Sequence, residues 1–291
     1  MINRREFLRS TALGMTAVAT GSQSALDLLA NPLGMPIGLQ LYTVRAELPK
    51  DVTGTITRLA AIGYKEVEVY EFYGKTAAEF GKILKDNGLT APSGHYLTKH
   101  IKSDWEKHIA VAKELGIKYM VNAILEPPER KSLDDYKKAA ELFNKAAEQT
   151  RKAGIQFCYH NHNFEFKTYG SSTAYDFLLK ETDPKLVKFE LDCFWVTRAG
   201  KDPVDYLTKH PGRFPLLHIK DLKPGYPTTV ADDFRPGPFT EVGQGIINWK
   251  RIFEAAPKGG MKHYFVEQDE CDRPPLESIK ISYDYLKNLK V

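Results

Sequence analysis

The chain repeats one local pattern four times: a helical stretch ends at a glycine, and an apolar, strand-like run follows at once. These junctions lie at residues 61–64, 86–89, 114–117 and 152–155. A glycine just past the end of a helix adopts the left-handed conformation that stops it. Strands that alternate with helices pair in parallel, because each return to the sheet needs a crossover. The pattern therefore predicts an α/β fold.

The same rhythm continues along the chain and gives eight candidate strands. They cover residues 37–42, 67–70, 91–96, 119–124, 157–160, 187–191, 216–219 and 264–267. The candidate helices cover 53–62, 77–87, 103–115, 133–153, 173–180, 203–210, 248–255 and 275–289. Eight units, with no glycine-rich phosphate loop after the first strand, favour a single (β/α)8 TIM barrel over an open doubly wound sheet. We expect this domain at residues 31–291, with the proline- and glycine-rich segment 223–244 as a lid over its site.

Residues 1–30 have the features of an export signal rather than of the barrel. Arg4 and Arg5 precede Phe7 and Leu8, and a short, weakly apolar run of small residues follows. Paired arginines before such a run are typical of a twin-arginine signal peptide. The alternative is a basic amphipathic helix on the folded domain. The run is too short to span a bilayer, so we expect a periplasmic or otherwise exported protein without a stable membrane anchor.

Charge and cysteine content exclude two further classes. The formal net charge is +4, and the N-terminal arginines contribute to it, so no basic stripe is left for a phosphate backbone. We therefore expect no nucleic-acid partner. The three cysteines, Cys158, Cys193 and Cys271, form no C-x-x-C pair, and an odd number is a poor disulfide framework. We interpret all three as structural.

Polar side chains stand near the end of every predicted strand. In a TIM barrel the active site lies at the C-terminal ends of the strands, so these side chains are expected to meet. We expect a small carbohydrate substrate, and the candidate substrate-binding residues are Gln40, Tyr42, Glu68, His95, Asn122, Trp195 and Gln244. Gln244 belongs to the turn 241–245, whose glycines could equally serve backbone geometry alone.

Four residues from strands five to eight form the candidate metal site. Asp192, His218 and Glu267 end strands six, seven and eight, and we place Glu165, just after strand five, as the fourth ligand. A carboxylate balances the charge of a hard cation, although His160 is the alternative at strand five. Any one such residue could instead be a helix cap. A mixed carboxylate–imidazole set suits a divalent metal ion, Mn²⁺, Co²⁺, Mg²⁺ or Zn²⁺.

Three residues are candidates for catalysis. His160 and His162 share one face of strand five because side chains alternate along a strand. The histidine that does not bind metal is a candidate general base or acid, or a group that orients a ligand. Lys220 points the same way as His218 and could stabilise an enediolate oxygen.

Several segments resemble the xylose isomerase-like superfamily of sugar phosphate isomerases and epimerases. They are residues 38–45, 159–166, 191–192, 218–221 and 241–245, and the resemblance covers about residues 36–290. It implies a barrel with a metal held by Glu, Asp, His and Glu from strands five to eight. Asp192, His218 and Glu267 match that pattern, whereas His160 stands where sugar-epimerising members have Glu. Exported relatives with the Tyr-His-Asn-His pattern resemble enzymes of 3-keto sugars or glycosides.

Three functions follow as hypotheses. The first is a metal-dependent isomerase or epimerase that acts on a sugar or keto sugar through an enediolate. The second is a lyase or dehydratase that acts on 3-keto glycosides or inosose-like substrates by β-elimination. The third is a non-catalytic periplasmic sugar-binding protein, although binding alone does not need several imidazoles. Cleavage of abasic DNA fits neither the charge nor the export signal. A homo-oligomer is compatible with the sequence.

Overall fold

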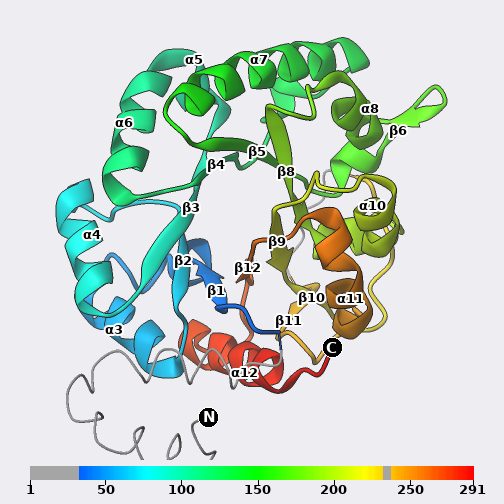
Figure 1. Cartoon of the computed structure of the whole chain (residues 1–291). Helices are drawn as coiled ribbons and strands as arrows, with labels where there is room; N and C mark the ends of the chain where they lie inside the picture. The colour runs from blue at the N-terminus through cyan, green and yellow to red at the C-terminus, as the bar shows by residue number, and fades with distance from the viewer. Residues whose placement is uncertain (1–32, 232–236) are drawn as a thin grey trace, which may run out of the picture.

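The computed structural model describes residues 33–231 and 237–291, and its centre is a closed barrel of eight parallel strands (Figure 1). The strands are β1 (Gly38–Gln40), β2 (Glu66–Val69), β3 (Thr90–Tyr96), β4 (Tyr119–Asn122), β5 (Gln156–His160), β8 (Val187–Asp192), β9 (Leu216–Ile219) and β12 (His263–Val266). Their order around the barrel is β1-β12-β9-β8-β5-β4-β3-β2. The predicted TIM barrel is confirmed. The predicted export signal lies outside the described residues and stays a prediction.

Helices surround the barrel and alternate with its strands (Figure 1). They are α3 (Val52–Ile62), α4 (Ala77–Asp86), α5 (Thr98–Ser103), α6 (Trp105–Leu115), α7 (Leu133–Lys152), α8 (Ala174–Glu181), α9 (Cys193–Arg198), α10 (Pro203–Lys209), α11 (Trp249–Gly259) and α12 (Pro275–Asn288). The helix predicted at 103–115 begins later and is preceded by α5, because Asp104 leaves the helical conformation with φ −143°. None of the helices in the described ranges is long and apolar enough to cross a bilayer.

The local signals in the sequence account for the element boundaries. Gly116 has φ +76° and ends α6, as the repeated glycine junctions predict. Thr76 and Glu79 form a reciprocal capping box at the start of α4. Gly38 lets β1 approach β12 closely, because a Cβ at this position would lie 2.4 Å from the ring of Phe265. The barrel therefore closes at a position where only glycine fits.

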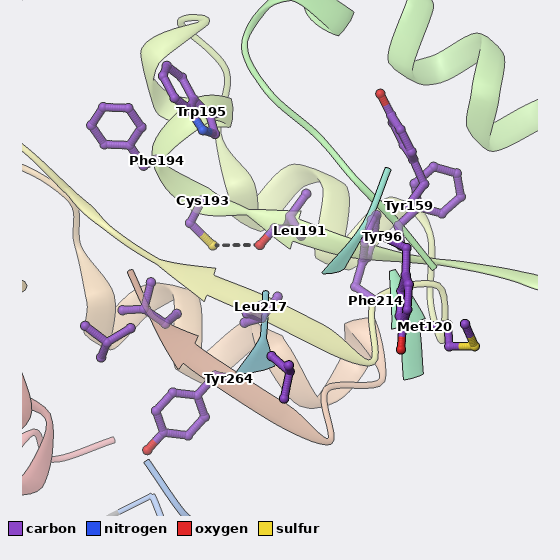
Figure 2. Close-up of a cluster of buried hydrophobic side chains, with 14 of the residues drawn as sticks. Tyr96, Met120, Tyr159, Leu191, Cys193, Phe194, Trp195, Phe214, Leu217 and Tyr264 are labelled. Atoms are coloured by element: carbon purple, nitrogen blue, oxygen red, sulfur yellow. Dashed lines mark hydrogen bonds between the residues drawn. The ribbon is translucent and has the colours of Figure 1, made fainter. Parts of the chain in front are cut away.

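The apolar core has two parts. The larger part packs the helices against the outer faces of the strands, and Figure 2 shows a portion of it around Leu191, Leu217 and Tyr264. The smaller part fills the barrel interior with Val121, Cys158, Leu216 and Phe265. Three of these lie two residues before a polar residue at the C-terminal end of a strand: Cys158 before His160, Leu216 before His218 and Phe265 before Glu267. Because side chains alternate along a strand, these polar residues lie directly above the apolar cluster that fills the barrel interior.

Three further features complete the described chain. The cysteines are all free; Cys158 and Cys193 are buried, whereas Cys271 is partly exposed. Two short hairpins lie outside the barrel: β6 (Thr168–Tyr169) with β7 (Ser172–Thr173), and β10 (Asp221–Leu222) with β11 (Phe239–Thr240). The second hairpin joins the two ends of the segment expected to form a lid. Three one-turn 3-10 helices are η1 (Leu41–Val44), η2 (Pro127–Glu129) and η3 (Phe164–Phe166).

Candidate active site

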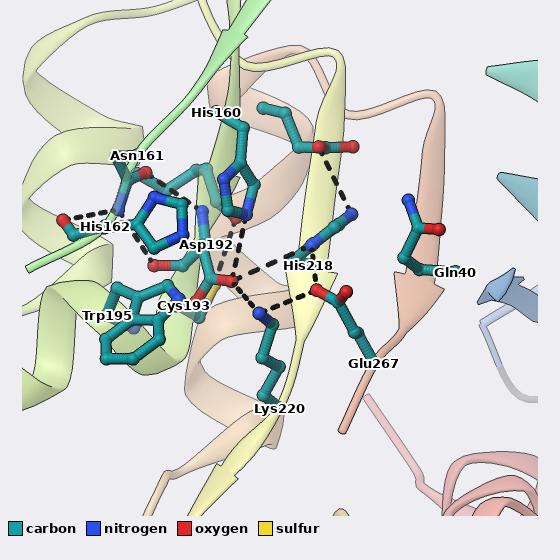
Figure 3. Close-up of polar contacts among 12 residues, drawn as sticks. Gln40, His160, Asn161, His162, Asp192, Cys193, Trp195, His218, Lys220 and Glu267 are labelled. Atoms are coloured by element: carbon teal, nitrogen blue, oxygen red, sulfur yellow. Dashed lines mark hydrogen bonds and ion pairs between the residues drawn. The ribbon is translucent and has the colours of Figure 1, made fainter. Parts of the chain in front are cut away.

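Four polar side chains converge where β5, β8, β9 and β12 end (Figure 3). They are His160, Asp192, His218 and Glu267, and each is buried. One potential ligand atom from each residue lies within 4.8 Å of those of the other three. Asp192, His218 and Glu267 thus come together as the strand pattern predicts.

Asp192 serves two purposes through its two oxygens. Its Oδ1 accepts a hydrogen bond of 2.9 Å from the backbone N–H of Trp195 and so caps α9. Its Oδ2 faces His160 and Lys220 at 3.2 and 3.1 Å. A helix-capping role and a ligand role are therefore compatible at this position. The cap also explains why a short helix that the sequence did not predict begins directly after β8.

His160 has its tautomer fixed by the backbone. Its Nδ1 lies 3.1 Å from the carbonyl oxygen of Ala123, which can only accept, so Nδ1 carries the proton. Nε2 then presents a lone pair to Asp192 Oδ2 at 3.2 Å. Burial lowers the pKa of His160 to about 4, which keeps the ring neutral. A lone pair facing a carboxylate is unfavourable unless a cation lies between them.

His218 presents the same arrangement with its nitrogens reversed. Its Nε2 lies 2.7 Å from Glu68 Oε2 and donates to it. Its Nδ1 makes no aligned hydrogen bond, although it lies 2.9 Å from Glu267 Oε2 and 3.7 Å from Asp192 Oδ2. Burial opposes protonation of His218, but the surrounding carboxylates outweigh it and raise its pKa well above the ordinary value. The site therefore favours a positive charge between these groups.

The four-residue set thus has the chemistry of a divalent metal site. Two imidazole nitrogens and two carboxylates converge, and each histidine donates its other N–H to an oxygen behind it. Metal-binding histidines in proteins are usually held in this way. Glu68 and the Ala123 carbonyl supply the outer hydrogen bonds. The residues present therefore fit a bound Zn²⁺, Co²⁺ or Mn²⁺ ion.

Glu68 anchors a second layer beneath this set. Its buried carboxylate accepts hydrogen bonds from Gln40 Nε2 at 2.6 Å and from Ser93 Oγ at 2.5 Å. It also lies 3.1 Å from His95 Nε2. Although burial raises the pKa of Glu68, the charges of His95 and His218 outweigh it and hold that pKa well below its usual range. Gln40 and Glu68 are completely buried and do not line the pocket, so the structure places them beneath the histidines. Their predicted contact with substrate stays a prediction.

Glu190 is a residue of this cluster that was not predicted from the sequence. Its Oε2 lies 2.7 Å from His95 Nε2 and 3.2 Å from His218 Nε2. Glu190 stands two residues before Asp192 on β8, so strand alternation was a signal that could have identified it. Burial and the neighbouring Glu68 raise the pKa of Glu190 to about 7. Burial alone would lower the pKa of His95, but the charges of Glu68 and Glu190 outweigh it and raise that pKa to about 9.

Lys220 lies beside the metal-ligand set, on the same side of its strand as His218. Its ammonium is 2.6 Å from Glu267 Oε2, 3.1 Å from Asp192 Oδ2 and 2.9 Å from Asp269 Oδ2. Burial alone would lower the pKa of Lys220, but these carboxylates raise it well above the usual value. Lys220 is therefore a fixed cation at the site. Asp269, its partner just after β12, was not predicted from the sequence.

The structure places Glu165 away from the other proposed ligands, which corrects its assignment to the metal site. Its Oε1 accepts from the Tyr159 hydroxyl, and its Oε2 accepts from the His162 backbone N–H at 2.8 Å. The 3-10 turn after β5 folds this carboxylate back beneath the loop. Burial raises the pKa of Glu165 to about 7. His160, the alternative, occupies the strand-five position of the set.

Two predicted substrate-binding residues also lie elsewhere. Asn122 is buried, and its Nδ2 donates to the Tyr96 carbonyl at 3.2 Å and to Thr98 Oγ1 at 3.3 Å. Gln244 is exposed on the turn that precedes α11 and does not line the pocket. Asn122 thus faces a neighbouring loop rather than the barrel axis, and Gln244 lies on an exposed turn outside the pocket.

Asp221 explains the turn that contains Gln244. Its carboxylate accepts hydrogen bonds from the N–H groups of Gly243 and Ile247 at 2.9 and 3.1 Å and from Trp249 Nε1 at 2.8 Å. At Gly245 a Cβ would lie 2.1 Å from Asp221 Oδ1. The glycines of this turn thus serve backbone geometry, which was the alternative interpretation of the motif.

A pocket of about 410 Å³ opens above the cluster at the C-terminal face of the barrel. Among the predicted residues, Tyr42, His95, His160, His162, Trp195, Lys220 and Glu267 line it. Its other lining residues include Arg45, Tyr70, Glu126, Phe239, Asp269 and Glu270, which the sequence analysis did not select. Phe239 and Pro238 come from the segment expected to form a lid, so this segment does contribute to the wall.

A closed parallel barrel with this polar cluster at its C-terminal face has the arrangement of a TIM-barrel active site. Residues 56–289 match the family model described as xylose isomerase-like TIM barrel, and the chain belongs to this family. A crystal structure of a sugar phosphate isomerase/epimerase from Parabacteroides distasonis is similar, with 29% identity and a TM-score of 0.74, over 87% of this chain and 98% of that one.

Two further similarities extend this comparison. An inosose dehydratase from Geobacillus thermodenitrificans is 25% identical over 264 residues, which cover 80% of this chain and 87% of that one. A crystal structure of a protein named IOLI, which contains a bound zinc atom, has a TM-score of 0.68 with 15% identity, over 86% of this chain and 96% of that one. At that identity the likeness shows the fold alone. The chain is an enzyme related to sugar isomerases, epimerases and dehydratases, so the hypothesis of a non-catalytic binder is set aside.

Proposed function

We propose that this enzyme uses a divalent metal ion to remove the proton next to the carbonyl of a keto sugar or keto cyclitol, and then eliminates a group from the next carbon. One observation carries the proposal. His160 Nε2 and His218 Nδ1 both point at the carboxylates of Asp192 or Glu267, and the nitrogen of His160 does so without a proton. The bound zinc of the IOLI protein and the dehydratase activity named for the Geobacillus relative agree with it.

The metal would be held by His160 Nε2, His218 Nδ1 and one oxygen each of Asp192 and Glu267. When bound, a divalent ion polarises a carbonyl and stabilises the negative charge that its oxygen gains on proton loss. The ammonium of Lys220, 2.6 Å from Glu267 Oε2, would add a second positive charge at the edge of this site. Lys220 is thus an electrostatic stabiliser rather than a base.

His162 is the candidate base. Its ring lines the pocket between Phe164 and Trp195, with centroid distances of 5.2 and 5.4 Å. Burial lowers the pKa of His162 well below the ordinary value, so the ring is neutral in the resting site, as a base must be before it takes a proton. His160 is less suited to this role, because the Ala123 carbonyl and the metal set engage both its nitrogens.

His95 is the candidate acid for the leaving group. It lines the pocket, and its Nε2 is held by Glu190 and Glu68 at 2.7 and 3.1 Å. In the elimination, His162 takes the proton from the α-carbon, and the C–H electrons form a carbon–carbon double bond. The bond from the β-carbon to oxygen breaks, and that oxygen leaves with a proton from His95. Afterwards His162 releases its proton to solvent, and His95 takes one up from solvent.

Isomerisation or epimerisation is the second candidate, favoured by the similarity to the Parabacteroides isomerase/epimerase. Epimerisation by proton removal and return needs an acid–base group on each face of the substrate. The strand-five position that holds a glutamate in the epimerases of this superfamily holds His160 here, with both of its nitrogens engaged. This difference is our reason to rank elimination first.

The test combines metal analysis with substrate chemistry. Purified protein is analysed for bound metal and then incubated in heavy water with 3-keto glycosides, inososes and free ketoses. We expect metal-dependent release of the leaving group and an unsaturated ketone product. Deuterium exchange without release would favour isomerisation. Neither metal dependence nor exchange with any substrate would refute the proposal.

A matched pair of variants tests which strand-five residue binds the metal. We expect His160→Ala to lose bound metal and activity together. Glu165→Gln keeps its acceptor for the loop N–H and should retain metal, because its carboxylate lies outside the ligand set. Metal loss in Glu165→Gln with retention in His160→Ala would restore the original assignment.

A further inference from the structure

We infer that the mouth of the pocket is a second-ring subsite built on Tyr70, and that it takes an uncharged ring attached to the reacting sugar. The substrate class is then a neutral glycoside rather than a phosphorylated single sugar. The identity of the reacting ring rests on the proposed function, whereas the subsite rests on the residues of the mouth alone.

Tyr70 is an exposed aromatic side chain on a pocket wall. It follows β2 directly, lines the pocket and is 38% exposed. Large apolar side chains are otherwise mostly buried in the described part of the chain, and Tyr226, the other tyrosine with comparable exposure at 37%, lies outside this pocket. An aromatic ring that stays open inside a pocket is suited to packing against a ligand ring.

The Tyr70 ring is held in place by an ordered neighbour. It meets the ring of Tyr42 edge-on, with centroids 4.9 Å apart. The guanidinium of Arg45 lies 3.9 Å from the centre of the Tyr42 ring. Arg45 in turn donates to the carbonyls of Tyr42 and Asp269 at 2.8 and 2.7 Å. The platform is therefore preorganised, which reduces the entropy lost when a ring binds.

The position of this platform separates it from the reacting centre. Tyr42 and Tyr70 follow β1 and β2, whereas three of the four metal-ligand candidates end β5, β8 and β9. Only β12 contributes to both regions, through Glu267 and then Asp269 and Glu270. A ligand ring above the metal set therefore leaves the Tyr70 side of the same pocket for a second ring.

The charges of the pocket oppose a phosphate at this place. Arg45 and Lys220 line the pocket and already contact backbone carbonyls and three carboxylates respectively. His95, the third cationic lining residue in the described chain, is held by Glu68 and Glu190. The acidic lining residues are Glu126, Glu267, Asp269 and Glu270. On the Tyr70 side a dianion would face Asp269 and Glu270 as well as Arg45, whereas carboxylates accept hydrogen bonds from sugar hydroxyls readily.

The experiment measures binding by calorimetry to the metal-loaded full chain, independently of turnover. The probes are methyl β-glucoside, phenyl β-glucoside, glucose and glucose 6-phosphate. Aromatic pairs contribute about 0.5–1.5 kcal/mol, so the phenyl glucoside should bind roughly 3- to 10-fold more tightly than the methyl glucoside. Tyr70→Ala should abolish this difference and leave methyl glucoside binding unchanged. Tyr70→Phe should preserve it.

Tyr226→Ala is the matched control, since it removes an equally exposed tyrosine outside the pocket. Equal binding of the two glucosides, no binding of either, or an equal loss of both in Tyr70→Ala overturns the subsite. Tighter binding of glucose 6-phosphate than of glucose overturns its neutral character. Tyr70-dependent binding without metal-dependent chemistry on any keto sugar would instead refute the proposed function and leave the subsite standing.

Discussion

Replacing Glu68 with glutamine is the sharpest test of how the second layer controls the metal site. The wild-type carboxylate accepts from Gln40, Ser93 and His218, and it lies within 3.1 Å of His95 Nε2. Glutamine offers one acceptor oxygen in place of two, and its amide N–H group would face other donors. His218 would then lose the acceptor that keeps its proton on Nε2 and its lone pair on Nδ1.

Two effects of different size follow from this geometry. Loss of an outer hydrogen bond to a metal ligand typically weakens metal affinity about 10- to 100-fold, or about 1.4–2.7 kcal/mol. At least one buried donor is also left unpaired, which costs about 1–3 kcal/mol of folding free energy. For a domain of this size the Tm should fall by about 2–4 °C for each kcal/mol.

Glu66→Gln provides the matched control on the same strand. Glu66 also accepts from a histidine, His263 Nδ1 at 2.8 Å, but at the opposite end of β2. We expect both variants to lower the Tm in the metal-free protein, and only Glu68→Gln to weaken metal binding in a competition titration with a chelator. The reasoning is refuted if folded Glu68→Gln binds metal as tightly as wild type, or if Glu66→Gln weakens binding to the same extent.

Three further predictions concern the metal, the turn before α11 and pH. Binding of the metal at about a hundred times its Kd adds about 2.7 kcal/mol to the free energy of unfolding. Removing the metal with a chelator should therefore lower the Tm in a thermal scan by roughly 5–10 °C. An unchanged Tm would contradict this prediction. Asp221→Ala leaves four N–H donors without their acceptor and should lower the free energy of unfolding in urea by more than about 2 kcal/mol. A loss below about 0.5 kcal/mol would argue against this role. Burial raises the pKa of Glu165 to about 7. The folded state therefore keeps a proton that the unfolded state loses above the ordinary pKa of a glutamate. This group makes the free energy of unfolding fall as pH rises between about 4.5 and about 7. Glu165→Gln should remove that decline when unfolding free energies at about pH 5 and about pH 8 are compared with wild type, and an identical pH dependence would count against it.

The sequence by itself determined the barrel and brought three candidate ligands to one face of it. Helix-ending glycines and short apolar strands are local signals, and a parallel return to a sheet requires a crossover, so the repeat admits few other folds. Because the C-terminal ends of parallel strands meet at one face, Asp192, His218 and Glu267 had to lie near one another once the strands were assigned.

Only the tertiary structure decided which neighbouring groups complete the site. Glu165 and His160 were both candidates for the ligand from strand five. The 3-10 helix after this strand places the Glu165 carboxylate against the Tyr159 hydroxyl, so only His160 faces the other candidate ligands. The support of His218 by Glu68 joins residues 150 positions apart, and the Arg45–Asp269 contact joins residues 224 positions apart. Period-two alternation tells which face of a strand a side chain occupies, but not which distant loop folds over that face. The second layer and the mouth of the pocket therefore depend on packing that no local pattern encodes.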